Sequence, residues 1–255
     1  MKDENIDKIK KFICLGSEIT GNLTSVAIGY LFPEVACSGA LLNPVVKNLL
    51  IDYGNDFINR KLSNREQIRI GISFTYTTTK IQKFIQDGKE LRKDDFFDCS
   101  GKYTSDAGEI LEGVLLASQR EHEEKKIIYY SNLLANIAFD ENISKSFANN
   151  ILRLAQQLSY IQLCLLKIYE NTSLYQLKNE DFEEFFEQYG NLDVYQQTIQ
   201  LNSLHLTNGN EYVIGLGCIV PEQIHLTQIG KCLVNMMSLS DIPSKDLEEV
   251  AKFLR

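Results

Sequence analysis

A stretch of 35 residues, Asp106 to Asp140, constrains the fold of this chain more than any other. It contains no proline, and its two glycines lie in its first turns. Apolar residues fill both ends, and nine polar residues in a row, Ser118 to Lys126, separate them. Asp106 and Glu109 have the spacing of a helix N-cap and its N3 partner. We therefore expect one continuous helix, roughly 50 Å long at 1.5 Å per residue, at the centre of an N-terminal helical bundle.

The polar run Ser118 to Lys126 holds the densest group of titratable side chains in the chain. His122 and Glu123 begin the H-E-x-x-H zinc motif, but the second histidine is replaced by Lys126. A di-iron E-x-x-H pair fails as well, because Gln119 stands three residues before His122. A charge run on a long helix is usually a solvated or salt-bridged face. We expect a solvated face here, with no catalytic, cofactor-binding or metal-binding residue.

The rest of the chain offers no recognisable chemical motif. His205 and His225 are isolated, and no Ser or Cys stands in a nucleophile context. The glycines form no phosphate-binding loop, and the six cysteines form no C-x-x-C pair. Several cysteines lie in apolar runs, which favours reduced thiols in a core. An enzyme is therefore disfavoured, and no cofactor is expected.

Composition indicates an ordinary globular protein. The 255 residues are 44% hydrophobic and 24% charged, with a net charge of −8. A negative chain is a poor general binder of nucleic acid, which requires a cationic surface. The N-terminus, MKDENIDKIKKF, has no signal-peptide pattern, so a cytoplasmic location is expected.

The apolar stretch Ile19 to Ile51 permits two interpretations. Its uncharged runs end at Pro33 and Val46, and each is shorter than the ~20 residues of a membrane-spanning helix. Pro33 and Pro44 favour short packed segments. We predict a buried helical hairpin within the bundle, and the alternative is a membrane-perturbing effector that a trigger releases.

After this stretch, Ser63 and Glu66 form an S-x-x-E capping box, and Gly88 is placed to end the helix. The segment IRIGISFTY between them alternates with period two, as a strand does. The two end signals favour a helix. The following loop, residues 88–105, has neighbouring basic and acidic clusters that are typical of a solvated face.

The last part of the sequence predicts short strands as well as helices. Ser144 and Ser159 each precede an apolar helical stripe, the first running to about Leu158. Helices are then expected at 193–204, 227–239 and 244–254, with strands at EYVIGLGCIV (211–220) and at IHL ending at Leu226. This order predicts a winged helix-turn-helix. The predicted fold is mostly α, with a helical bundle at 1–158 and a small α+β winged-helix-like domain at 159–255.

Charge distinguishes a winged-helix domain that binds DNA from one that binds protein. Residues 159–255 hold six basic and thirteen acidic side chains, a net charge of −7. The expected recognition helix, 193–204, has no Lys or Arg to contact phosphates. Gln196, Gln197 and Gln200 could read adenine edges, so a DNA-binding regulator is kept as an alternative. The favoured function is contact with a protein partner or with a second copy of the chain.

Several segments together resemble a known group of bacterial proteins. They are LSNREQIRIG, KDDFF, EILEGVLLASQREHEEKKIIYYSNLLANIAF, LSYIQLCLLKI and IHLTQIGKCL. They are similar to uncharacterised bacterial proteins near the abortive-infection alpha-like group, in which a helical bundle precedes a winged-helix-like tail. The resemblance covers about two thirds of the chain, from Leu62 onward, and its motifs are caps and core stripes. It implies a cytoplasmic bacterial protein in phage defence, and it brings no site residue with it.

Overall fold

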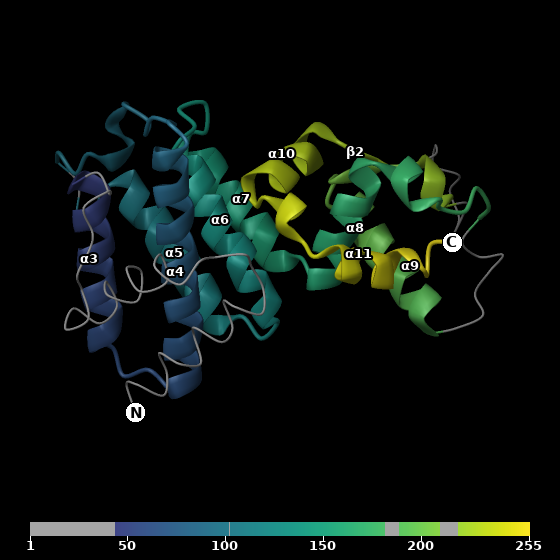
Figure 1. Ribbon diagram of the computed structural model, residues 1–255, viewed down its shortest axis with the longest axis horizontal. Coiled ribbons are helices and arrows are strands. Elements are labelled where there is room, and N and C mark those ends of the chain that lie inside the picture. Colours follow the sequence, from purple (N-terminus) through teal and green to yellow (C-terminus); the bar gives the residue numbers. More distant parts are fainter. Residues whose placement is uncertain (1–43, 102, 182–188, 210–218) are drawn as a thin grey trace. The chain divides into compact units, whose positions relative to one another are not determined.

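The computed structural model describes residues 44–101, 103–181, 189–209 and 219–255 (Figure 1). Helices dominate these residues, which confirms the predicted mostly α class, and the described sheet has two strands. None of the helices described is both long enough and apolar enough to cross a membrane. The chain divides into two compact units, Met1–Gln157 and Leu158–Arg255.

All the regular secondary structure described in the first unit is helical. Its helix α4 packs chiefly on α6 and α5, and α5 also packs on α7 and α3 (Figure 1). The elements in order are α3 (Pro44–Asn59), α4 (Asn64–Gln86), η2 (Asp95–Phe97), α5 (Asp106–Arg120), η3 (Glu124–Lys126), α6 (Ile127–Ile137) and α7 (Lys145–Gln157).

Local end signals set the limits of α4. The Glu66 N–H donates to Ser63 Oγ at 3.3 Å, and the Glu66 carboxylate accepts from the Ser63 N–H at 2.8 Å. At the other end Gly88 has φ +78°, and the Lys89 N–H donates to the Phe84 carbonyl at 2.9 Å. The helix prediction for IRIGISFTY is thus confirmed. Every residue from 70 to 79 is buried, and a helix buried on all sides has no apolar stripe for periodicity to detect.

The stretch 106–140 is not one helix, and this prediction is wrong. Helix α5 ends at Arg120, Glu121 is extended (φ −68°, ψ 126°), and α6 begins at Ile127. The N-cap is also displaced by one residue, because Ser105 Oγ accepts from the Gly108 N–H at 3.0 Å. No proline or glycine causes the break. Side-chain interactions, described below, stabilise it.

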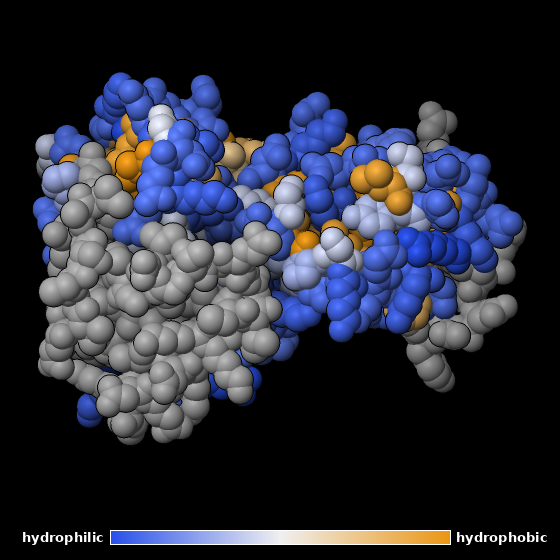
Figure 2. All heavy atoms as spheres, viewed as in Figure 1, coloured by the Kyte–Doolittle hydropathy of each residue, from blue (hydrophilic) through white to orange (hydrophobic). Residues whose placement is uncertain are grey.

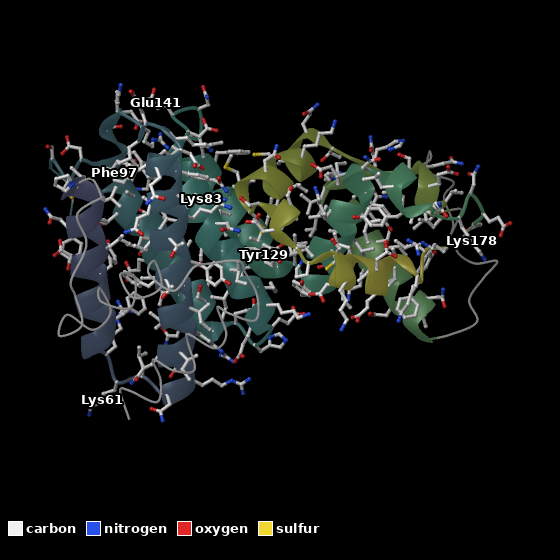
Figure 3. All side chains as sticks on the ribbon, viewed as in Figure 1. Lys61, Lys83, Phe97, Tyr129, Glu141 and Lys178 are labelled. Atoms are coloured by element: carbon white, nitrogen blue, oxygen red, sulfur yellow. The ribbon has the colours of Figure 1, made fainter. Side chains whose placement is uncertain are left out.

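The loop 88–105 is only partly the solvated face that its charges predicted. Arg92 is 7% exposed, and its guanidinium donates to the carbonyls of Ile137 (3.4 Å) and Ile143 (2.9 Å). The same guanidinium lies 4.2 Å from the ring centre of Phe96, which is 2% exposed. The loop therefore supplies hydrogen-bond donors to carbonyls at the end of α6 and beyond it. A further hydrogen bond to this region runs from the Lys93 N–H to the carboxylate of Glu141, which Figure 3 labels.

Of the apolar stretch Ile19 to Ile51, residues 19–43 lie outside the described structure. Its last residues begin α3, with Pro44 as the first helical residue. A proline is tolerated there because the first N–H groups of a helix lack intrahelical partners. Val46 and Leu50 are each 1% exposed, so this end of the stretch belongs to the core.

In the second unit α8 packs on α11, α9 and α10. Ser159 caps α8 as expected, and Thr227, expected as the first residue of a helix, is the N-cap of α10. The backbone of Lys178 joins the loop after η4 to the chain end, donating to the Leu254 carbonyl at 2.8 Å (Figure 3). The elements in order are α8 (Tyr160–Glu170), η4 (Thr172–Tyr175), α9 (Tyr189–Ser203), β1 (Thr207–Asn208), η6 (Pro221–Gln223), β2 (His225–Leu226), α10 (Gln228–Met236), η7 (Leu239–Asp241) and α11 (Ser244–Ala251).

The strand predicted at IHL is β2, which pairs antiparallel with β1 in the register Thr207↔Leu226. The predicted strand 211–220 falls almost entirely outside the described residues, and the two that remain, 219 and 220, are not in a strand. Pro221 is the first residue of a short 3-10 helix, η6, that lies between β1 and β2 in the chain. Gly230 permits α10 to start against β1, because a Cβ there would lie 2.1 Å from the Leu206 carbonyl oxygen.

Candidate functional site

The break between α5 and α6 contains a buried ion pair. The Glu121 carboxylate accepts from Lys126 Nζ at 2.7 Å and from the Tyr130 hydroxyl at 2.6 Å. Its other oxygen accepts from the Glu123 N–H at 3.0 Å. Glu121, Lys126 and Tyr130 are 8%, 3% and 1% exposed. The prediction that the polar run is a solvated face is therefore wrong for its two buried charges, while His122 is 88% exposed.

The chain folds this way because leaving the helix brings three donors to one carboxylate. The extended backbone at Glu121 and the 3-10 turn η3 return Lys126 to the side chain of Glu121. On the outer side of the run, Arg65 Nε donates to Glu124 at 3.1 Å. Gln119 likewise donates to Glu66 at 2.8 Å. These contacts bind the polar run to α4.

Burial and hydrogen bonding oppose each other at Glu121. Burial alone would raise the pKa of its carboxyl, but the hydrogen bonds from Lys126, Tyr130 and the Glu123 N–H outweigh it and lower the pKa. Burial, followed by the hydrogen bond to Glu121 and then by the charge of Glu121, raises the pKa of the Tyr130 hydroxyl. Glu121 is therefore the ionised acceptor at neutral pH, and Tyr130 remains a donor.

The same cluster is the one place among the described residues where side chains could hold a metal ion. Ligand atoms of Glu121, His122 and Glu123 lie within 4.8 Å of one another. The Glu121 carboxylate, however, already binds an ammonium group at 2.7 Å. A cation at that distance repels a second one, and the donors occupy both carboxylate oxygens. The residues present therefore do not suit a metal.

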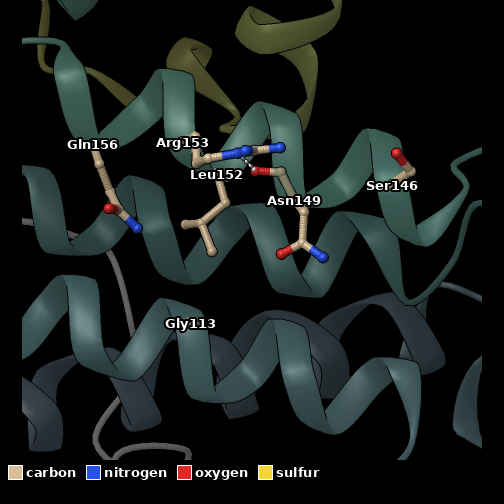
Figure 4. Close-up of a pocket in the computed structure, with 6 residues that line it drawn as sticks. All are labelled: Gly113, Ser146, Asn149, Leu152, Arg153 and Gln156. Carbon is tan, nitrogen blue, oxygen red and sulfur yellow. Dashed lines mark hydrogen bonds between the residues drawn. The ribbon is translucent and has the colours of Figure 1, made fainter.

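A shallow depression of about 490 Å³ lies between α5 and α7 (Figure 4). Gly113 lets Leu152 approach closely, because the Cδ2 of Leu152 would be 2.7 Å from a Cβ at that position. Arg153 is the charged residue of its lining, and it is exposed. The lining has no carboxylate or histidine to activate a substrate. The lining residues are Gly113, Ser146, Asn149, Leu152, Arg153 and Gln156.

The glutamines of α9 are bound within the second unit. Ser159 Oγ donates to the Gln197 side-chain oxygen at 2.6 Å, and Gln162 Nε2 donates to that of Gln200 at 2.9 Å. Ser159 and Gln162 are also the capping box of α8. Two of the three glutamines that could read a base edge therefore hold α9 against α8. Nothing in their sequence spacing indicated this pairing.

The charged residue on the exposed side of α9 is Asp193. Leu192 is 51% exposed, and Asp193 and Gln196 are exposed beside it. No Lys or Arg lies in Tyr189–Ser203. Figure 2 shows hydrophilic residues over most of the second unit's visible face with apolar ones among them, and Leu174 and Leu192 are its exposed large apolar side chains among the described residues.

The isolated histidines and the described cysteines join no catalytic arrangement. His205 has φ +55° where the chain turns from α9 to β1, and its carbonyl accepts from Thr227 Oγ1 at 2.7 Å. His225 is exposed in β2. Cys99, Cys164 and Cys232 are free of disulfides.

Comparison of the chain with protein-family models, with curated proteins and with solved structures gave no match. Its function is inferred below from the side chains and from the resemblance described above.

Proposed function

We propose that this protein is non-enzymatic and acts through protein–protein contacts made by its second unit. In this proposal the first unit is a helical bundle and the second a winged-helix-like domain. The order α8, α9, β1, β2, α10 supports the winged-helix assignment, with β1 and β2 as the base of the wing and α9 in the place of the recognition helix.

The exposed face of α9 carries the proposal. DNA-reading helices bring cations that contact phosphates and polar side chains that contact base edges. On α9 the cations are absent, and Gln197 and Gln200 are bound by the cap of α8. What remains on the exposed face is Leu192 beside Asp193 and Gln196. An exposed apolar side chain with a polar surround is the pattern of a protein interface.

The resemblance to abortive-infection alpha-like proteins supplies the setting of the proposal. What the resemblance implies is a protein of the bacterial cytoplasm that acts in phage defence. Counting plaques on cells with and without the gene tests that setting separately from the contact itself.

Photo-crosslinking tests the contact. A photo-reactive amino acid at Gln196, exposed on α9, should form an adduct with protein in the cells that make this chain. Mass spectrometry then shows whether the adduct contains a different protein or a second copy. Leu192→Asp should abolish the adduct. Leu174→Asp is the matched control, since Leu174 is 71% exposed on η4, and it should leave the adduct intact. An adduct that survives Leu192→Asp, or none in the unmodified chain, contradicts the proposal.

A further inference from the structure

The turn between α5 and α6 contains no residue type that ends a helix. Residues 118–126, SQREHEEKK, include no glycine or proline and are mostly good helix formers. In a helix, Glu121 and Lys125 would also have the (i, i+4) spacing of a favourable ion pair, with the acid on the N-terminal side. The local sequence therefore favours one continuous helix from Asp106 to Ile137, and the turn must be stabilised by something else.

The buried cluster of Glu121, Lys126 and Tyr130 forms only when the chain turns. In a straight helix, at about 100° per residue, Lys126 would project roughly 140° away from Glu121, and Tyr130 would project from the opposite side. Neither side chain could then reach the carboxylate. In the turn, Lys126 Nζ and the Tyr130 hydroxyl lie 2.7 Å and 2.6 Å from it. The cluster therefore stabilises the bent form alone.

Helices α5 and α6 run in opposite directions along α4. Gln119, near the end of α5, donates to Glu66 at the start of α4, and α5 also packs on η2, which follows α4 in the chain. Helix α6 begins after the turn and ends at Ile137, whose carbonyl accepts from Arg92 beyond the far end of α4. A straight helix could not keep both halves packed on one copy of α4. Nine of the eleven residues of α6 are buried, so α6 would need the α4 of a second copy.

We propose that the Glu121–Lys126 pair is a lock that prevents a domain-swapped dimer. Without the lock, residues 106–137 form one helix, and α6 with the chain that follows it packs on the α4 and α5 of a second copy. Contacts such as that between Ser73 and Ser131 are then remade between the two chains. The two forms differ chiefly at the turn and in the entropy of association. This exchange belongs to the first unit and is independent of the contact proposed for α9.

Removing the lock from the full-length chain should produce the dimer. Glu121→Leu with Lys126→Leu replaces both buried charges by apolar helix formers, a change that often leaves stability intact. It also leaves the Tyr130 hydroxyl without its acceptor in the bent form. Every chain carries Leu192→Asp, so that the contact proposed for α9 adds no mass. After refolding from urea at high protein concentration, light scattering should give the mass of two chains for the leucine variant and of one chain with the native turn. Equal masses overturn the proposal.

A cysteine pair distinguishes the exchange from any other dimer. The hydroxyl oxygens of Ser73 and Ser131 are 3.1 Å apart, so the sulfur atoms of Ser73→Cys and Ser131→Cys should be close enough to form a disulfide. On a non-reducing gel the pair should link two chains in the leucine variant and should close within one chain when the turn is native. Each single substitution is the control for the native cysteines. A dimer in which the pair does not link two chains overturns the proposal.

Proline tests whether the dimer contains the continuous helix. Glu121 is extended (φ −68°, ψ 126°), as the residue before a proline prefers to be, and the side chain of His122 is 88% exposed. The turn should therefore accept His122→Pro, whereas a helix interior does not. Added to the leucine variant, His122→Pro should restore the mass of one chain, and a persistent dimer contradicts the proposal.

A milder variant keeps the test decisive if circular dichroism shows that the leucine variant does not fold. Tyr130→Phe keeps the ring in the core and removes one of the donors to the Glu121 carboxylate. It should raise the fraction of chains linked through the cysteine pair above that of the chain with the native turn. An unchanged fraction overturns the proposal.

Discussion

Glu121 and Lys126 depend on each other because each is buried with an opposite charge as its principal partner. Removing both charges from such a pair often changes stability little, whereas removing one leaves the other desolvated and unpaired. Here the carboxylate also accepts from the Tyr130 hydroxyl, which is 1% exposed. The loss of the carboxylate would leave two buried donors without an acceptor.

Glu121→Ala should therefore lower the free energy of unfolding by about 3–5 kcal/mol. Glu123→Ala is the matched control in the same turn, and it should cost less than ~0.5 kcal/mol, because this side chain is only partly buried. Leu134→Asp, which buries an unpaired carboxylate in α6, shows for comparison how much stability a defect in the core costs. Urea denaturation followed by circular dichroism measures all three. Equal losses for the two glutamate variants would contradict the ion-pair interpretation.

The same carboxyl predicts a pH dependence. Its pKa is lowered from the ordinary value of 4.5, so the unfolded chain binds the proton more readily than the folded one. The stability it contributes is fully present above pH 4.5 and is lost as the pH falls through the lowered pKa. The stability difference between wild type and Glu121→Gln should shrink over that acid range. A difference that is constant down to acid unfolding would show that the charge of Glu121 does not contribute.

Helix ends were predictable where one residue and its near neighbours decide them. Ser63 with Glu66, Ser144 and Ser159 each satisfy N–H groups within three residues, and the sequence displays such spacing directly. The break at Glu121 was not predictable in this way. It depends on Lys126 and Tyr130, five and nine residues on, and neither has the spacing of a helical neighbour. Likewise the partner of β2 is β1, a two-residue strand too short for any pattern.

Gly230 fixes how α10 meets β1, and substitution tests this. A methyl group there would lie 2.1 Å from the Leu206 carbonyl oxygen, a backbone atom that also accepts from the Thr227 N–H at 3.1 Å. Gly230→Ala should cost about 1–3 kcal/mol through overpacking. Gly209→Ala is its control, because a Cβ there would meet Ile224 at an ordinary 3.5 Å. Thermal unfolding that affects both variants alike would show that the close approach is not needed.

Charge acts over the whole chain, and it was fully predictable because it depends on composition alone. The net charge is −8, and residues 159–255 hold −7 of it. The structure adds what composition could not supply, namely which polar groups are available. Gln197 and Gln200 were candidates from the sequence, and only the packing of α8 against α9 shows that they are engaged.

The negative charge of residues 159–255 and the engagement of Gln197 and Gln200 predict how the purified protein behaves with duplex DNA. Non-specific binding at physiological salt typically has a Kd of about 10⁻⁴–10⁻⁶ M and arises from released counterions. An acidic unit without cations on α9 cannot release them, so we expect no shift of duplex DNA at any protein concentration up to about 10⁻⁵ M. Replacing Asp193 and Gln196 by lysine should introduce weak, salt-sensitive binding, since it supplies phosphate contacts on the exposed face. Tight binding by the unmodified chain that weakens steeply with added salt would reverse the assignment, because α9 would then be a recognition helix and Leu192 would face a groove.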